Sequence, residues 1–305
     1  MRDTFVATLL EAAKKDKNII LMTGDLGYGV LDTFEKELPG QFINSGVNEQ
    51  AMMGMAAGYA STGKRVFVYS IGNFPTLRCL EQIRNDVCLM NNPVVVVSVG
   101  AGYAYGSQGY THHALEDIAV LRALPNMEVI VPADPAETAQ LTLSIIASKK
   151  PTYLRLGKSG EPTIHTSAPK VSHGSINEVS PGTSGTLIFA GSVGTVAVAA
   201  AKELADQGVS VAVASMPFVS TVDINYLQGA LKKGPVIVIE EHSYRGGVGT
   251  AVLEAANAAN LRGAIGLIAA DQNNLSQIGD QNFLRSANGI SVENIIKKFN
   301  ALKVN

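Results

Sequence analysis

The stretch Val94-Val-Val-Val-Ser-Val99 consists almost entirely of β-branched apolar residues and is followed by Gly100. Strands of this composition are usually buried on both faces, at the centre of a parallel sheet covered by helices. Outward from it, short apolar runs alternate with longer patterns of helical periodicity, which predicts an α/β fold. The expected strands are 19–23, 42–45, 65–70, 94–99, 127–131 and 152–156, and the expected helices are 3–16, 48–61, 75–90, one from about 115, and 134–148.

A second unit of the same kind follows a change in composition. Between about Gly157 and Gly185 the chain is rich in Gly, Ser, Pro, Thr and Lys and has few periodic apolar positions, which is typical of a linker. Beyond it we expect strands 186–190, 209–214 and 236–240, helices that end near 207, 232 and 260, and a last helix at 292–299. The sequence therefore predicts two parallel-sheet α/β domains, 1–160 and 185–305, joined by a linker at 161–184.

Composition and charge exclude several classes of protein. The 305 residues are 46% hydrophobic, the net charge is −2, and the basic residues are scattered, so we expect no nucleic-acid partner. The first residues lack the apolar core of a signal peptide, and no segment has about eighteen consecutive apolar residues, so we expect a cytoplasmic protein with no membrane partner. Cys79 and Cys88 match no metal-ligand or disulfide pattern, and we expect no metal ligands in this chain.

One acidic residue stands at the start of a helical pattern of small residues, Gly46-Val-Asn-Glu-Gln-Ala-Met-Met-Gly-Met-Ala-Ala-Gly-Tyr-Ala60. Asn48 is the expected N-cap, so Glu49 falls in the first turn, where the helix dipole favours a carboxylate. The small side chains that follow allow another backbone or a flat ligand to approach closely. On this stretch alone, the dipole is the simplest explanation of Glu49.

The loops that follow the strands of the first unit carry unusual residues. Ligands bind beyond the carboxyl ends of parallel strands, so function is expected in these loops. Gly24-Asp-Leu-Gly-Tyr-Gly29 follows the first strand, Phe74 precedes a proline after the third, and a glycine-rich loop runs from Gly100 to paired histidines after the fourth. A loop of that length is usually functional, although each feature taken singly also fits a turn, a core ring or a structural histidine.

Together these motifs resemble transketolases and 1-deoxyxylulose-5-phosphate synthases. The motifs are Gly46-x-x-Glu-x-Ala51, Tyr69-Ser with Phe74, Gly109-x-Thr-His112, Leu124-Pro-Asn-Met-Glu-Val-Ile-Val-Pro-Ala-Asp-Pro135, Glu240-Glu-His-Ser and Gly246-Gly-Val-Gly249. The resemblance implies a pyrimidine-binding domain followed by the transketolase C-terminal domain. It also implies the cofactors thiamine diphosphate and Mg²⁺.

The resemblance assigns cofactor roles to individual residues. Glu49 matches the catalytic glutamate that hydrogen-bonds the aminopyrimidine and promotes the imino tautomer, whose exocyclic nitrogen deprotonates the thiazolium ring. Phe74 matches the ring that stacks beside the pyrimidine. Asp25 corresponds to an acid near the cofactor, while Ile71 and Leu77 occupy places where transketolases often have aromatic residues.

The resemblance also assigns substrate roles. His112 matches a catalytic histidine that faces the substrate, and Arg155 matches the arginine for the substrate phosphate, with Lys158 as a weaker helper. Two positions depart from the family. Gln108 stands where transketolases have an aspartate that contacts a sugar hydroxyl, and Gly100 aligns near a further histidine for sugar phosphate. These departures put the usual sugar-phosphate donor in question, whereas the chemistry depends on Glu49 and the cofactor.

Half of the family's cofactor site is missing from this chain. Family members hold the diphosphate through Mg²⁺ with an amino-terminal domain that carries Gly-Asp-Gly and a later Asn. Gly24-Asp25 does not meet this pattern, because Leu26 replaces the second glycine and the nearest candidate, Asn48, adjoins Glu49. The chain therefore resembles the C-terminal subunit of a split enzyme. We expect an N-terminal partner subunit and a heterotetramer with two chains of each kind.

Three functions fit this sequence. The first is a split transketolase, active only with its partner, that moves a two-carbon ketol unit from a ketose or its phosphate to an aldehyde. The second is the beta subunit of a 2-oxo acid dehydrogenase or decarboxylase, and the third is a non-catalytic scaffold subunit. The Thr111-His112 and Arg155 matches favour the first, and the retention of Glu49, Phe74 and His112 argues against the third.

Overall fold

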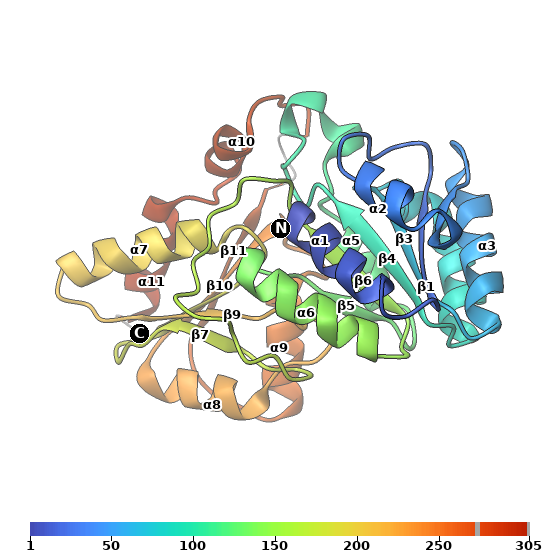
Figure 1. The fold of residues 1–305 in the computed structure, drawn as a ribbon. Helices are drawn as coiled ribbons and strands as arrows, with labels where there is room; N and C mark the ends of the chain where they lie inside the picture. Colours follow the sequence, from blue (N-terminus) through green and yellow to red (C-terminus); the bar gives the residue numbers. More distant parts are fainter. Residues whose placement is uncertain (272–274, 304–305) are drawn as a thin grey trace.

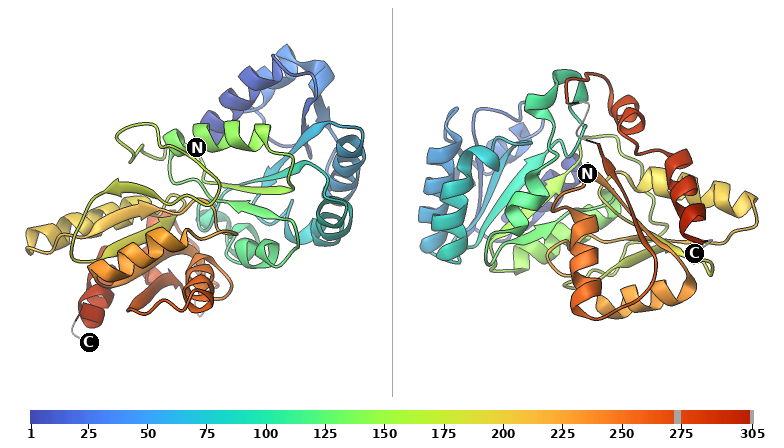
Figure 2. Two further views of the ribbon diagram at one scale, coloured as in Figure 1. Left: turned by 90° about the horizontal axis from the view of Figure 1, so that it is seen from below. Right: turned by 180° about the vertical axis from the view of Figure 1, so that it is seen from behind.

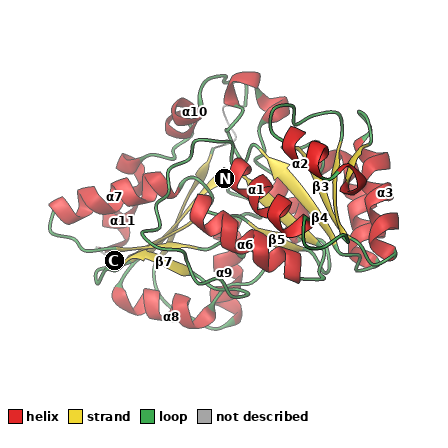
Figure 3. Cartoon of the chain, viewed as in Figure 1, coloured by secondary structure: helices red, strands yellow, loops and turns green. Residues whose placement is uncertain are grey.

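The computed structural model describes residues 1–271 and 275–303, which form two α/β units side by side (Figure 1). Figure 2 shows the same units from below and from behind, with the first in blue to green and the second in yellow to red. In both units the strands lie between helices (Figure 3), so the predicted succession of two α/β domains is confirmed. Within the described ranges, no helix combines the length and apolarity needed to cross a bilayer.

The first sheet has six parallel strands in the order β2-β1-β3-β4-β6-β5. Their bounds are β1 Ile19–Thr23, β2 Phe42–Asn44, β3 Arg65–Ile71, β4 Val94–Val99, β5 Glu128–Ile130 and β6 Thr152–Leu156. Every residue of β4 is buried, as the composition of this strand predicts. Alternate side chains of β4 enter different hydrophobic clusters, one with α1 (Arg2–Ala13) and α6 (Pro135–Ala147), the other with α3 (Glu49–Ser61).

The helix expected over 75–90 is interrupted. The 3-10 turn η2 (Leu77–Cys79) and the short helix α4 (Leu80–Gln82) precede the π-helical segment η3 (Ile83–Leu89). Cys79 and Cys88 are buried and free. Irregular helical segments of this kind occur frequently at functional sites. The other short elements of the first unit are α2 Asp32–Glu37, η1 Pro39–Gln41, η4 Gly106–Gln108, η5 Tyr110–His112 and α5 Asp117–Arg122.

The second sheet is mixed, in the order β11-β10-β8-β9-β7, because β7 runs antiparallel to β9 while the other neighbours are parallel. The strands are β7 Asn177–Ser180, β8 Thr186–Ala190, β9 Ala212–Ser215, β10 Val236–Ser243 and β11 Ile265–Ala270. The helices are α7 Gly194–Asp206, α8 Ile224–Lys233, α9 Val248–Ala258, α10 Gln281–Ala287 and α11 Val292–Lys303.

The sequence pattern does not predict β7, β11, α10 or α2. β7 lies within 161–184, the segment expected to be a linker. It is four residues long, and its one buried residue is the polar Asn177, so it lacks the apolar alternation that marks a strand. The expectation of a purely parallel second sheet is corrected by this one added strand.

Candidate active site

Glu49 is the first residue of α3, beside loops at the carboxyl edge of the first sheet. The Asn48 side chain accepts a hydrogen bond from the backbone N of Ala51 at 3.2 Å, which confirms the predicted N-cap. Glu49 is only 7% exposed, yet it borders a pocket of about 320 Å³ with Val47 and Gln50. A ligand in this pocket can therefore reach a carboxylate that bulk water barely contacts.

An arginine that the sequence analysis does not single out connects Glu49 to Phe74. Arg78 Nη1 lies 3.2 Å from Glu49 Oε1, and the guanidinium carbon lies 4.1 Å from the centroid of the Phe74 ring. The ring of His112 packs edge-on against Phe74, with 5.3 Å between centroids. These four side chains form a continuous row. A basic residue four positions after Phe74 is the only signal in the sequence, and the interrupted helix decides where it lies.

The two histidines of the long loop have different environments. His112 is half-buried, and its Nδ1 lies 3.0 Å from Thr111 Oγ1. His113 is buried, with Nε2 3.3 Å from the carbonyl oxygen of Gly106 and its ring packed edge-on against Tyr103. Burial lowers the pKa of His113. His112 is thus the histidine that contacts Phe74, while His113 holds the loop in place.

Asp25 connects two of the loops around Glu49. Its carboxylate accepts hydrogen bonds from the Tyr28 hydroxyl at 2.7 Å and from Asn44 Nδ2 at 3.2 Å, and these bonds lower the pKa of Asp25. Asn44 Oδ1 in turn accepts hydrogen bonds from the backbone N of Asp25 and of Gly46. Asp25 is exposed and fixes the approach to α3.

Three further residues that the resemblance assigns to the cofactor or the sugar lie near the ends of their elements. Ile71 is half-buried at the end of β3, and Leu77 is 40% exposed at the start of η2, next in the chain to Arg78. Gln108 is exposed at the end of η4. All three belong to loops or loop edges, which is where the fold leaves side chains accessible.

Arg155 is not available to a substrate, contrary to the sequence-based expectation. It is 2% exposed, and its guanidinium donates to Asp117 Oδ2 at 2.7 Å and to the carbonyl oxygens of Ala114 at 2.6 Å and Glu241 at 3.0 Å. The Tyr153 hydroxyl donates to the same Asp117 carboxylate. Although burial opposes the effect, the charge of Arg155 lowers the pKa of Asp117. Arg155 therefore joins the first unit to β10 of the second.

Lys158, unlike Arg155, is accessible. It is exposed, and its Nζ lies 5.1 Å from the centroid of the Tyr105 ring. The carbonyl oxygen of Lys158 accepts a hydrogen bond from the backbone N of Arg2 at 3.1 Å, and the Arg2 side chain also interacts with Tyr105. Lys158 borders a crevice of about 540 Å³, which the two units share. The other residues that line the crevice include Ser107, Ser192, Thr195 and Arg285.

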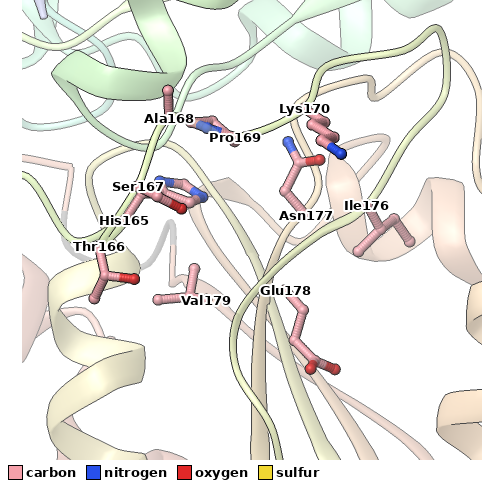
Figure 4. A pocket seen from close by; sticks show the side chains of 10 residues that line it. All are labelled: His165, Thr166, Ser167, Ala168, Pro169, Lys170, Ile176, Asn177, Glu178 and Val179. Carbon is pink, nitrogen blue, oxygen red and sulfur yellow. The ribbon is translucent and has the colours of Figure 1, made fainter.

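A different pocket, of about 390 Å³, lies between β7 and the segment that precedes it (Figure 4). His165 borders it, and Asp134 accepts hydrogen bonds from the backbone N and Nδ1 of His165, both at 2.9 Å. None of the site residues predicted from sequence lines this pocket. The row that contains Glu49 remains the stronger candidate site.

Two family descriptions match the chain. The family described as transketolase, pyrimidine binding domain, matches residues 1–162, and that described as transketolase, C-terminal domain, matches residues 174–293. The chain belongs to the transketolase family. It consists of a pyrimidine-binding domain and a transketolase C-terminal domain.

Several relatives of this transketolase-family chain are themselves single subunits of larger enzymes. The chain is 38% identical over 256 residues to one subunit of an apulose-4-phosphate transketolase of Phocaeicola vulgatus, covering 83% of this chain and 82% of the relative. A 1-deoxy-D-xylulose-5-phosphate synthase of Desulfotalea psychrophila is 33% identical over 299 residues, which are 96% of this chain but 46% of that protein. A solved structure titled split gene transketolase, inactive beta4 tetramer, superposes with a TM-score of 0.91 at 29% identity, covering 99% of this chain and 98% of that one.

Proposed function

We propose that this chain is the pyrimidine-side subunit of a two-chain transketolase, which uses thiamine diphosphate and Mg²⁺ to transfer a two-carbon ketol unit from a ketose to an aldehyde. The observation that carries the proposal is the continuous row made by Glu49 at the start of α3, Phe74 after β3 and His112 in η5, with Arg78 between Glu49 and Phe74. The family matches and the split-gene relatives support it.

The residues present fit the aminopyrimidine half of the cofactor. The Phe74 ring is half-buried, so one face can stack on a flat heterocycle, and the Glu49 carboxylate reaches a pocket of about 320 Å³. When bound, thiamine diphosphate supplies a nucleophilic carbon that accepts the ketol unit. Glu49 would hold the aminopyrimidine by a hydrogen bond, and Ile71 and Leu77 would shield the ring from water. His112 would donate a hydrogen bond to the substrate.

The diphosphate half of the site calls for a second chain. Leu26 replaces the second glycine of the Gly-Asp-Gly pattern, and the nearest later asparagine candidate, Asn48, caps α3 beside Glu49. We propose that a partner subunit with the Gly-Asp-Gly motif binds the diphosphate and Mg²⁺, in an assembly of two chains of each kind. The Phocaeicola vulgatus relative, which is named as one subunit of a transketolase, supports this proposal.

For the anionic end of the substrate, the accessible cation Lys158 replaces Arg155 in our proposal. Lys158, Arg2 and Tyr105 gather at the carboxyl edge of the first sheet, where a phosphate can be bound by two cations and a hydroxyl. Gln108 would contact a sugar hydroxyl. The apulose-4-phosphate relative supports a phosphorylated substrate.

Glu49→Gln tests the proposal in the purified two-chain complex. We expect ketol transfer to fall by about 10³-fold, because an amide cannot accept the proton that the carboxylate exchanges with the cofactor ring. Glu293→Gln is the matched control, since Glu293 is an exposed acid in the first turn of another helix, α11. Full activity of Glu49→Gln would contradict the proposal. Release of carbon dioxide from a 2-oxo acid without an aldehyde would favour the decarboxylase alternative.

A further inference from the structure

The guanidinium of Arg78 contacts both side chains that the proposed function assigns to the aminopyrimidine. It pairs with Glu49 Oε1 at 3.2 Å and lies over the Phe74 ring at 4.1 Å. A guanidinium is a planar cation whose N–H groups lie in one plane, so it can stack on an aromatic face and donate to a carboxylate at the same time. An aminopyrimidine has comparable requirements, namely a flat face that stacks on Phe74 and a ring nitrogen that shares a proton with Glu49.

The Glu49–Arg78 contact also explains how the carboxylate is tolerated. The Glu49 side chain is 8% exposed, and a nearly buried carboxylate without a compensating partner is costly. The Arg78 side chain is 53% exposed, so it extends from solvent over Phe74 to the edge of the pocket. Arg78 therefore neutralises Glu49 from the side that a ligand would approach.

About half of the Arg78 side chain faces water, whereas its backbone is held. Gln50 Nε2 donates to the carbonyl oxygen of Arg78 at 3.0 Å, which ties η2 to α3. The guanidinium contacts Glu49 and Phe74, and about half of the side chain faces water. A rotamer change can therefore move the guanidinium into solvent without disturbing the backbone.

We propose that Arg78 and the aminopyrimidine compete for Glu49 and for one face of Phe74, so that the guanidinium withdraws as the cofactor binds. The inference rests on the proposed function and adds a positioning residue to it. In the free chain Arg78 keeps the carboxylate paired, and in the assembled complex the cofactor takes over both contacts. Part of the binding free energy of the cofactor is spent on displacing Arg78.

The test is calorimetric titration of thiamine diphosphate, at saturating Mg²⁺ and without substrate, into the assembled two-chain complex. We expect Arg78→Met to bind the cofactor about tenfold more tightly than the unchanged protein, because one exposed ion pair and one cation–π contact no longer have to be broken. Arg84→Met is the matched control, since Arg84 is an exposed arginine of the neighbouring segment η3 that donates to Asn85. We expect its affinity to stay unchanged.

Arg78→Lys distinguishes the contribution of the positive charge from that of the planar guanidinium group. A lysine keeps the attraction to Glu49 but cannot stack as a flat group, so its affinity for the cofactor should fall between those of Arg78→Met and the unchanged protein. Equal or weaker binding by Arg78→Met would overturn the inference, since Arg78 would then be neutral or a ligand of the cofactor. Absence of binding by the unchanged complex would instead overturn the proposed function itself. The proposed competition would also be overturned by a structure of the complex with thiamine diphosphate bound in which the Arg78 guanidinium still lies over the Phe74 ring.

Discussion

Single residues decide the shape of the loop that borders the crevice beside Lys158. Gly100 has φ +97°, a conformation that favours glycine, and a Cβ at this position would lie 2.3 Å from the ring of Tyr105. Tyr105 thus fills the space that a side chain at position 100 needs. The two departures from the family pattern, Gly100 and Gln108, flank this tyrosine in the chain. In our proposal, recognition of the substrate phosphate rests on Tyr105 and the cations Lys158 and Arg2 beside it.

Gly100→Ala should lower the free energy of unfolding by about 3 kcal/mol, because it adds a clash to a strained backbone conformation. Gly160→Ala is the control, since Gly160 has φ +87° but open space around its Cβ position, so only the backbone cost of about 1 kcal/mol remains. Chemical denaturation measures both. Equal losses in the two variants would show that Tyr105 does not restrict position 100, and Tyr105→Ala should recover part of the loss in Gly100→Ala.

At the scale of elements, the amino end of α6 holds the segment between the two units. Asp134 caps α6 by accepting a hydrogen bond from the backbone N of Glu137, and its other oxygen accepts from the backbone N of Ile164 and from His165. Burial opposes ionisation, but the bonds from His165 prevail and lower the pKa of Asp134 to about 2. The pKa of His165 is raised, since its bond with Asp134 outweighs the effect of burial.

These shifts predict a pH window for the contact. Because the pKa of Asp134 is lowered in the folded chain, its carboxylate stabilises the fold at pH values above the unfolded pKa of about 4. This stabilisation is lost as the pH falls towards the folded pKa of about 2. Because the pKa of His165 is raised in the folded chain, this histidine contributes its full stabilisation at pH values below the unfolded pKa of about 6.5. That stabilisation is lost as the pH rises through the pKa of the folded state. The contact is therefore strongest between about pH 4 and 6.5.

Asp134→Asn should reduce the melting temperature most within that window and flatten the loss of stability below about pH 4. Asparagine remains a good N-cap, so the variant removes the charge and not the cap. Asp223→Asn is the control, because Asp223 caps α8 through the backbone N of Tyr226 without a histidine. Thermal unfolding across pH 2 to about 8 checks the expectation. Parallel curves for Asp134→Asn and the unchanged protein would contradict it.

At the scale of the whole molecule, buried ionic contacts join the two units. Arg155 of β6 binds Asp117 of α5 and the carbonyl oxygen of Glu241 in β10, and Glu241 accepts a hydrogen bond from the backbone N of Tyr103. The Glu241 carboxylate also pairs with Arg285 of α10. The long loop of the first unit is therefore anchored to the second unit, and the crevice beside Lys158 has fixed walls on both sides.

The variants Arg155→Met and Lys158→Met should distinguish a residue that stabilises the fold from a residue that binds the substrate. Removal of Arg155 leaves the Asp117 carboxylate buried without its cation, so we expect a loss of about 3–5 kcal/mol in the free energy of unfolding. Lys158→Met should leave stability within about 0.5 kcal/mol but raise the KM for a phosphorylated substrate in the assembled complex by about tenfold. Calorimetry and steady-state kinetics measure the two effects. A raised KM in Arg155→Met at unchanged stability would restore Arg155 as the phosphate ligand.

The sequence by itself determined the α/β architecture, the order of its two units, the cap at Asn48 and the family. These properties depend on local sequence patterns, such as the apolar run 94–99 and the motif around Glu49. Only the tertiary structure decided that Arg155 is buried, that Lys158 is accessible and that Arg78 spans Glu49 and Phe74. The physical reason is that the partners and the exposure of a residue depend on segments distant in the sequence. A polar four-residue segment such as β7 is likewise a strand only because it pairs with β9.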